Sequence, residues 1–302
     1  MVDTRVRVGS VELANPVMCA SGTAGYGTEL ASYLDLSSLG AFVTKSLAAF
    51  EWAGNPAPRL HPTPQGMLNA VGLQGPGVAH WVDRVLPQLV EARATVVCSI
   101  WGRTVDDYRR AAALLADAPA DVVAVEVNLS CPNLEGRGSI FAHDPDLSAA
   151  VVEATAVCGR PRWAKLSPNT DRIVEVAAAV RDGGAEAVTL VNTLLGMVID
   201  PATLRPALGA GGGGLSGSAI HPVAVRAVHD VHVALPDLAI VGVGGVATGW
   251  DAAELMVVGA SAIQVGTATF ADPRACERVR RELCAWADGR GIPHLADLGD
   301  VA

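Results

Sequence analysis

The cysteine at position 131 is the residue with the clearest potential for chemistry. It lies in the segment Asn128-Leu-Ser-Cys-Pro-Asn133, among polar residues and a proline rather than in an apolar run. A free thiol has a pKa of about 8.5, so it can act as a nucleophile or a general base where its surroundings favour the thiolate. No histidine is close in sequence, and no Cys-His-Asn order typical of a cysteine protease is present. Spacing alone leaves a nucleophile, a base and a structural thiol open.

Two lysines stand at the ends of otherwise apolar segments that we predict as strands. Lys45 follows Ala41–Thr44, and Lys165 lies near the end of Arg162–Leu166. Burial of an ammonium group is costly without an anionic partner. Either lysine alone could be a rim residue with its amine in solvent, but the two together favour an anionic ligand.

Glycine clusters follow the last two predicted strands. Gly242-Val-Gly-Gly245 comes after the seventh strand and Gly266-Thr267 after the eighth. In barrels, exposed backbone N–H groups at these two places frequently bind phosphate. Tight turns are the alternative for either cluster alone. The match of Gly242–Ala247 to a dinucleotide fingerprint is weak, because it comes late in the chain and lacks the downstream acidic residue.

Four asparagines could recognise a planar heterocycle that carries both carbonyl and N–H groups, because an amide side chain both donates and accepts hydrogen bonds. They are Asn69, Asn128, Asn133 and Asn192. For Asn69, an ordinary turn is the alternative. His229 and His232 have helical i,i+3 spacing, but they fall on a predicted crossover helix away from the strand ends. We therefore expect no metal site.

Short β-branched runs alternate with amphipathic segments along the whole chain. The eight predicted strands are Val17–Ala20, Ala41–Thr44, Thr95–Ile100, Val122–Val127, Arg162–Leu166, Ala187–Val191, Leu238–Val243 and Ser261–Val265. The predicted helices include Val78–Ala92, Val105–Leu115, Pro145–Val157, Asp171–Arg181, His221–Val233 and Gly249–Val258. Eight buried strands with helical crossovers are typical of one α/β fold, the (β/α)8 TIM barrel, and a doubly wound sheet is the alternative.

A short N-terminal β-hairpin and a glycine-rich loop complete the predicted organisation. Arg5–Val8 and Val11–Leu13 flank Gly9-Ser10 and are predicted to close the bottom of the barrel. Gly209–Gly214 is predicted to be a mobile loop, because regular alternation resumes after it. No charge block or low-complexity linker divides the sequence, so we expect residues 1–302 to form a single domain.

Composition argues against several classes of function. The 302 residues carry a formal net charge of −9, which disfavours a nucleic-acid or anionic-membrane surface. The uncharged run Leu255–Ala271 is too short and too polar for a membrane span of ~20 residues, and no signal peptide is evident, so we expect a cytoplasmic protein. The six cysteines include no Cys-x-x-Cys pair, so neither a zinc ribbon nor an iron–sulfur cluster is encoded in this chain.

These features together resemble the dihydroorotate dehydrogenases of pyrimidine biosynthesis, and the resemblance extends over almost the whole chain. It is carried by the segments Asn15–Gly22, Thr44–Ser46, Asn55–Arg59, Gly66–Gln74, Glu126–Asn133, Lys165–Pro168, Val191–Met197, Gly213–Gly217 and Gly242–Val246. The resemblance implies a (β/α)8 barrel that holds FMN, one molecule per chain. A cysteine at position 131 and the bare N-terminus resemble class 1, since class 2 members use serine there and add an N-terminal membrane-associating segment.

Three segments resemble the 1B type within class 1, namely Gly66–Leu73, Asn192–Met197 and Gly213–Gly217. That type pairs the FMN barrel with a separate iron–sulfur flavoprotein subunit, which carries FAD and a [2Fe–2S] cluster, and it ultimately reduces NAD. The resemblance also implies a homodimer of barrels. A fumarate-dependent enzyme of the 1A kind and a paralogue that acts on another dihydropyrimidine stay open as alternatives.

The resemblance implies a role for each matching residue. Cys131 would take the C5 proton of dihydroorotate as a general base while a hydride passes from C6 to flavin N5. Dihydroorotate and orotate would be bound by Lys45, Asn69, Ala70, Val71, Gly72, Leu73, Asn128, Asn133, Asn192 and Thr193. FMN would be bound by Ser21, Lys45, Ser46, Ser99, Asn128, Lys165, Val191, Gly217, Gly244, Gly245, Gly266 and Thr267, with Lys165 near the N1/O2 edge of the ring.

The sequence departs from the family pattern in two places. Ser99 stands where the family usually has an asparagine that faces the flavin, and a hydroxyl reaches less far than an amide. After Cys131, the segment Leu134–Asp144 differs from the usual Phe-Gly-Thr-Asp ending of the loop that closes over the site. We expect the first change to affect the tuning of the flavin and the second to affect substrate preference.

Overall fold

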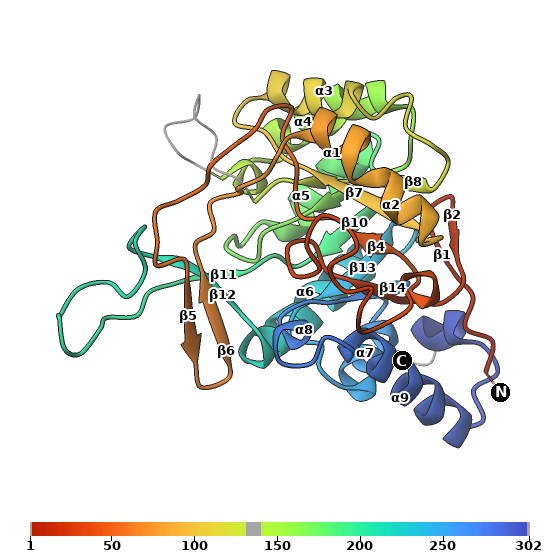
Figure 1. The fold of residues 1–302 in the computed structure, drawn as a ribbon. Coiled ribbons are helices and arrows are strands. Elements are labelled where there is room, and N and C mark those ends of the chain that lie inside the picture. Colours follow the sequence, from red (N-terminus) through yellow and green to blue (C-terminus); the bar gives the residue numbers. More distant parts are fainter. Residues whose placement is uncertain (1, 131–139, 301–302) are drawn as a thin grey trace.

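Eight parallel strands close into a barrel in the computed structural model, which describes residues 2–130 and 140–300 (Figure 1). In chain order the barrel strands are β3 (Val17–Cys19), β4 (Phe42–Val43), β7 (Val96–Ile100), β8 (Val122–Asn128), β9 (Arg162–Lys165), β10 (Ala187–Leu190), β13 (Ala239–Val243) and β14 (Ala262–Val265). Each strand pairs in parallel with the next, and β14 pairs with β3 to complete the circle. The predicted (β/α)8 barrel is confirmed, and every predicted barrel strand is present to within one residue at either end.

Helices surround the barrel and connect its strands (Figure 1). The α-helices are α1 (Val78–Arg84), α2 (Leu86–Glu91), α3 (Val105–Ala113), α4 (Pro145–Ala154), α5 (Ile173–Asp182), α6 (His221–Ala234), α7 (Gly249–Val257), α8 (Ala268–Ala271) and α9 (Ala275–Gly289). The short 3₁₀ helices are η1 (Leu36–Ser38), η2 (Phe141–His143), η3 (Thr155–Cys158), η4 (Ser218–Ile220) and η5 (Leu295–Asp300). Among the helices that the structure describes, none is both long enough and apolar enough to span a membrane.

The prediction of one helix over Val78–Ala92 is wrong. The segment forms two helices that meet at Val85, where the backbone leaves ideal helical geometry with φ −109° and ψ −45°. Pro87 lies in the first turn of the second helix. A proline has no backbone N–H, and its ring collides with the carbonyl four residues earlier, so it is tolerated at a helix start and not in the interior.

The N-terminal hairpin closes the lower end of the barrel, as predicted. Strands β1 (Val6–Val8) and β2 (Val11–Leu13) pair antiparallel around a tight turn at Gly9 and Ser10. The Ser10 N–H donates to the carboxylate of Glu186 at 2.8 Å. Glu186 directly precedes β10, so the turn lies against the amino ends of the barrel strands.

A four-stranded antiparallel sheet, which the sequence did not predict, stands beside the opposite end of the barrel. Its strands are β5 (Leu60–Thr63), β6 (Gly66–Asn69), β11 (Leu194–Gly196) and β12 (Gly213–Ser216), in the order β11-β12-β6-β5. Figure 1 shows this sheet projecting from the body of the molecule. The expectation that Gly209–Gly214 is entirely a loop is wrong, because Gly213 and Gly214 belong to β12 and Gly214 pairs with Asn69 of β6.

Most of the barrel is apolar and fully buried, because each strand is covered by the interior on one face and by helices on the other. Six buried polar side chains on five of the barrel strands interrupt this pattern. They are Ser99, Glu126, Asn128, Lys165, Thr189 and Gln264. Buried polar groups are costly unless they are hydrogen-bonded, so this group of side chains marks the part of the barrel where function is to be sought.

We predict that Thr248→Ala lowers the free energy of unfolding by about 1 kcal/mol, because Thr248 caps the start of α7. Its hydroxyl accepts the Asp251 N–H at 3.2 Å, and the Asp251 carboxylate accepts the Thr248 N–H at 2.8 Å. Urea unfolding followed by circular dichroism measures the change. Thr248→Ser keeps the hydroxyl and should match the parent, and an equal loss in both variants would contradict the capping explanation.

Candidate functional site

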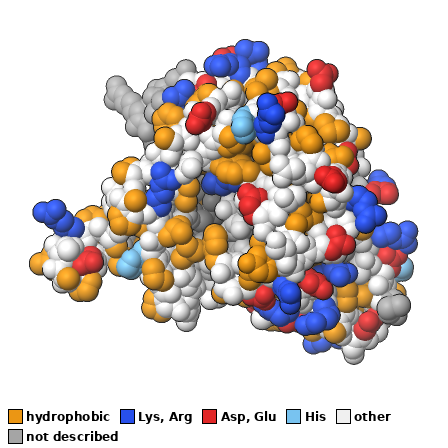
Figure 2. Space-filling model, in the orientation of Figure 1, with side chains coloured by type: hydrophobic (Ala, Val, Ile, Leu, Met, Phe, Trp, Pro, Cys, Tyr) orange, Lys and Arg blue, Asp and Glu red, His pale blue; other side chains and the backbone are white. Residues whose placement is uncertain are grey.

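A cavity of about 710 Å³ opens at the carboxyl ends of the barrel strands. Its walls come from the ends of the barrel strands on one side and from the four-stranded sheet on the other. Figure 2 shows a hollow in this face of the molecule between the projecting sheet and the barrel, with hydrophobic side chains along much of its rim. Barrel enzymes hold their active sites at this end, so the cavity is the candidate site.

The structure brings most of the predicted site residues together around this cavity. Lining residues from the predicted substrate set are Lys45, Asn69, Ala70, Val71, Gly72, Leu73, Asn128, Asn192 and Thr193. Lining residues from the predicted cofactor set are Ser21, Ser46, Lys165, Val191, Gly217, Gly244, Gly245, Gly266 and Thr267, together with Lys45 and Asn128. Cys131 and Asn133 lie outside the described residues. Residues 134–139 of the altered loop also lie outside them. The roles of all these residues stay predictions.

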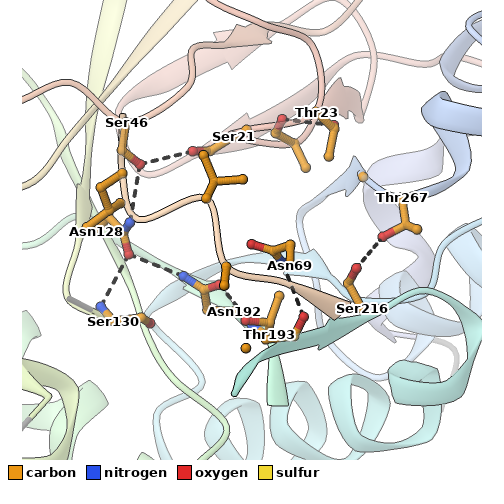
Figure 3. Close-up of a pocket in the computed structure, with 18 of the residues that line it drawn as sticks. Ser21, Thr23, Ser46, Asn69, Asn128, Ser130, Asn192, Thr193, Ser216 and Thr267 are labelled. Carbon is orange, nitrogen blue, oxygen red and sulfur yellow. Dashed lines mark hydrogen bonds between the residues drawn. The ribbon is translucent and has the colours of Figure 1, made fainter. Parts of the chain in front are cut away.

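Asparagine amides are oriented by one another and by the backbone (Figure 3). The side-chain carbonyl of Asn128 accepts both the Ser130 N–H and the Asn192 amide, each at 3.2 Å. This leaves the Asn128 amide nitrogen to donate to the Ser46 hydroxyl at 3.2 Å. On the opposite wall, the Asn69 amide donates to the Gly214 carbonyl at 3.2 Å, which joins β6 to β12. The cavity therefore presents amides in fixed orientations to a ligand.

The end of β8, which carries Asn128, is held from the outside by a tyrosine. The Tyr108 hydroxyl, on α3, donates to the backbone carbonyl of Asn128 at 2.5 Å. Tyr108 is fully buried, and its ring packs edge-on against Phe141 with the ring centres 5.4 Å apart. This contact ties the position of a cavity residue to the packing of the helical layer.

Ser99 does not line the cavity, although a position facing the flavin was predicted for it. It is fully buried beneath Ser21 and Ser46, and its hydroxyl lies 3.3 Å and 3.0 Å from theirs. The Ser21 and Ser46 hydroxyls are themselves 3.2 Å apart, so the three form a closed cluster under the cavity. The predicted contribution of Ser99 to cofactor binding is untested by this placement.

Lys165 reaches the floor of the cavity from β9 and has a carboxylate partner within the barrel. Its side chain is only 6% exposed, and its Nζ lies 3.7 Å from Oε1 of Glu126 and donates to Oε1 of Gln264 at 3.3 Å. From the sequence we expect an external anion to offset the charge of this lysine, and Glu126 is not among the predicted site residues. An acidic residue inside the otherwise apolar run Val122–Val127 was the signal that could have revealed it.

Glycines shape a turn after β13 that can approach an anion closely. Gly244 and Gly245 have φ values of +139° and +71°, and a Cβ on Gly245 would lie 2.7 Å from the Cβ of His221. No hydrogen bond joins the N–H groups of Gly245 and Gly266 to another residue within the described part of the chain. Backbone N–H groups that have no partner within the described protein can donate hydrogen bonds to a phosphate.

His221 supports this turn from behind and was not anticipated from the sequence. Its Nδ1 lies 2.8 Å from the Gly244 carbonyl oxygen, and its Nε2 lies 3.1 Å from a carboxylate oxygen of Glu254 on α7. The ring thereby connects the glycine turn to the helical layer. Nothing in the spacing of His221 indicated this, because its two partners are 23 and 33 residues away.

A group of aromatic side chains that is not among the predicted site residues forms part of the outer wall. Trp52 and Trp101 line the cavity, with ring centres 6.2 Å apart, and Phe50 packs edge-on against both. The guanidinium of Arg103, another lining residue, lies 4.4 Å from the centre of the Phe50 ring. This wall adds apolar surface and a positive charge close to the mouth.

The cysteines of the barrel interior are unsuited to proton transfer. Burial raises the pKa of the Cys19 and Cys98 thiols to about 12, because desolvation penalises the thiolate. A thiol of this kind stays protonated near neutral pH and cannot serve as a base.

Comparison with known proteins decides the family. The sequence model of the dihydroorotate dehydrogenase family matches residues 4–286. The chain belongs to the dihydroorotate dehydrogenase family. A protein from Geobacter sp. (strain M21), named dihydroorotate dehydrogenase B (NAD(+)), catalytic subunit, is 44% identical over 98% of this chain and 97% of its own length. A protein of the same name from Desulforudis audaxviator (strain MP104C) is 46% identical over 100% of this chain and 98% of its own length. The resemblance inferred from the sequence is confirmed.

Dihydroorotate dehydrogenases are flavin-dependent oxidoreductases, and the residues of this cavity fit a flavin nucleotide. The glycine turn at 244–245 leaves no room for a Cβ and offers backbone N–H groups to a phosphate. Lys165 places an ammonium at the floor, where negative charge on a reduced ring would be stabilised. The backbone N–H groups and the ammonium of this cavity are therefore suited to the flavin cofactor that dihydroorotate dehydrogenases use.

We predict that Gly245→Ala weakens the binding of FMN to the apoprotein about tenfold or more, because a side chain strains the positive φ and displaces His221. Quenching of FMN fluorescence during titration measures the dissociation constant. Gly159→Ala is the matched control, since Gly159 has a φ of +62°, has nothing within 4 Å of the added Cβ, and does not line the cavity. Equal dissociation constants for the two variants would contradict the assignment of the turn.

Proposed function

We propose that this protein oxidises (S)-dihydroorotate to orotate in the de novo synthesis of pyrimidine nucleotides, with FMN as the first electron acceptor. One observation carries the proposal: in a chain of this family, two lysines and two oriented amides line the same cavity. The lysines are Lys45 and Lys165, and the amides belong to Asn128 and Asn192. A carboxylate-bearing pyrimidine needs one cation and several amide partners, whereas a reduced flavin needs a second cation.

One FMN would bind per chain, with its phosphate on the glycines of the last two strand ends. We assign the phosphate to Gly217, Gly244, Gly245, Gly266 and Thr267, and the region of the ring to Ser21, Ser46, Val191 and Lys165. Thr267 is oriented for this by donating to the Ser216 hydroxyl at 2.8 Å. When bound, FMN would supply the hydride acceptor that the side chains of this protein lack. We treat residues 1–302 as one FMN-binding domain.

The substrate would bind above the ring, between the barrel and the four-stranded sheet. Lys45 would pair with its carboxylate, and the amides of Asn69, Asn128 and Asn192 would hold its carbonyl and N–H groups. The mutual hydrogen bonds of Asn128 and Asn192 fix these amides before a ligand arrives, which lowers the entropy cost of binding. Asn133, Thr193 and the backbone of residues 70–73 complete the proposed set.

Cys131 is proposed as the general base that removes the C5 proton of dihydroorotate. The assignment rests on the motif, since Cys131 lies outside the described residues. The adjacent Ser130 N–H is held by the Asn128 side chain at 3.2 Å, so the residue before the base is connected to the proposed substrate amides. The high pKa values of the buried thiols Cys19 and Cys98 make them poor alternatives.

Electrons are proposed to leave through a partner subunit to NAD. The curated relatives are named catalytic subunits of an NAD(+) enzyme, which supports a separate iron–sulfur flavoprotein carrying FAD and a [2Fe–2S] cluster. We also propose a homodimer of barrels, supported by the large exposed side chains Leu195, Met197 and Leu204 on and beside the projecting sheet. A cytoplasmic location is proposed because the five described cysteines are free.

We predict that Cys131→Ala retains FMN but slows its reduction by dihydroorotate ~10²-fold or more, the usual scale for loss of a general base. Anaerobic stopped-flow absorbance of the flavin measures the rate. Cys284→Ala is the control, because Cys284 is a partly exposed free thiol on α9 away from the cavity. Reduction of the Cys131 variant at the parent rate would contradict the role of the base.

We predict that dihydrouracil, which lacks the carboxylate, reduces the flavin roughly tenfold to 100-fold less efficiently than dihydroorotate, since the charge-assisted bond to Lys45 is lost. Anaerobic bleaching at matched concentrations compares the two. Better reduction by dihydrouracil would favour a paralogue that acts on another dihydropyrimidine.

A second experiment addresses the electron acceptor. Turnover of the isolated chain with fumarate, compared with turnover with NAD plus the partner subunit, distinguishes the 1A from the 1B type of acceptor.

A further inference from the structure

A fully buried carboxylate lies directly beneath the floor of the cavity and has no part in the reaction as proposed. Glu126, on β8, is 0% exposed. Its Oε1 lies 3.7 Å from Lys165 Nζ and accepts the Ser99 hydroxyl at 3.2 Å. Its Oε2 accepts the Gln264 amide at 2.8 Å and the Thr189 hydroxyl at 3.3 Å. Four other barrel strands thus contribute a group to this one carboxylate.

The direction of these hydrogen bonds follows from Lys165. An ammonium only donates, so its 3.3 Å contact must be with the carbonyl oxygen of Gln264. The amide nitrogen of Gln264 then points at Glu126 and donates to it. With an ammonium and an amide N–H directed at it, and two hydroxyls able to rotate toward it, the side chain of Glu126 is surrounded by donors. Its surroundings are therefore complementary to a negative charge.

We propose that Glu126 is a positioning residue that holds the Lys165 ammonium under the flavin and offsets part of its charge. Through Lys165 it sets how strongly the cavity stabilises the negative charge of a reduced flavin. This inference rests on the proposed function, because it requires FMN to bind above Lys165. Glu126 itself does not line the cavity, so it acts through the lysine rather than on the ligand.

The sign of the effect follows from electrostatics. Two opposite charges 3.7 Å apart in a buried site are only weakly screened. An amide in place of the carboxylate keeps the shape of the side chain and removes its negative charge. The charge of Lys165 is then less compensated, so the reduced, anionic form of the flavin gains more stabilisation than the oxidised form. The midpoint potential of the flavin should become more positive.

The experiment compares the FMN-loaded parent with Glu126→Gln. We expect a more positive midpoint potential by anaerobic dye equilibration. We also expect sulfite, whose addition leaves negative charge on the ring, to bind at least about tenfold more tightly, the scale of a nearby charge change. Glu153→Gln makes the same chemical change on the exposed surface of α4 and should leave both values at those of the parent. A loss of packing alone would not tighten sulfite binding.

Glu126→Asp provides a second variant if the amide disrupts folding. It keeps the charge but withdraws it from Lys165 by one methylene, so its potential should lie above that of the parent and below that of the Gln variant. A Gln variant with the potential of the parent, or an Asp variant at or below it, overturns this inference alone. A parent chain that binds no FMN overturns the proposed function, and this inference with it.

Discussion

The contact between the Lys165 ammonium and the Glu126 carboxylate, inside an otherwise apolar barrel, is the constraint on which the site depends. Neither charge could be buried alone, and a buried ion pair contributes little net stability compared with apolar packing. Its donors come from β7, β9, β10 and β14, so the pair requires the barrel to be closed. The ion pair is therefore better explained by the positive charge that Lys165 presents to the cavity than by a contribution to the stability of the fold.

The fold and the location of the site could be predicted because they depend on local patterns. Strands such as β7 and β10 are buried on both faces, so they read as short, nearly continuous apolar runs. A barrel then brings the residues at the carboxyl end of each strand to one end of the molecule, so the sequence predicts that Lys45, Asn128 and Gly245 lie around one site. The glycines were informative for the same reason, since their positive φ values serve a turn at a known place.

The remainder depends on contacts between distant parts of the chain. Gln264 and Glu126 are 138 residues apart, and no pattern near either residue indicates the other. The projecting sheet was missed because its strands are short and include Pro62 and several glycines, which argue against strands when they are considered alone. The burial of Ser99 could not be predicted from the sequence either. It depends on Ser21 and Ser46, which come from two other strand ends and cover Ser99.

These distant contacts join into one network across the site. Asn192 donates to Asn128, Asn128 donates to Ser46, and Ser46 contacts Ser99, which in turn donates to Glu126 beside Lys165. The amides proposed for the substrate and the lysine proposed for the flavin are therefore connected through hydroxyl groups under the cavity. A hydroxyl can donate one hydrogen bond and accept another, so Ser99 can donate to Glu126 while it accepts from Ser46. Ser99 is thus the connection between the two halves of the site.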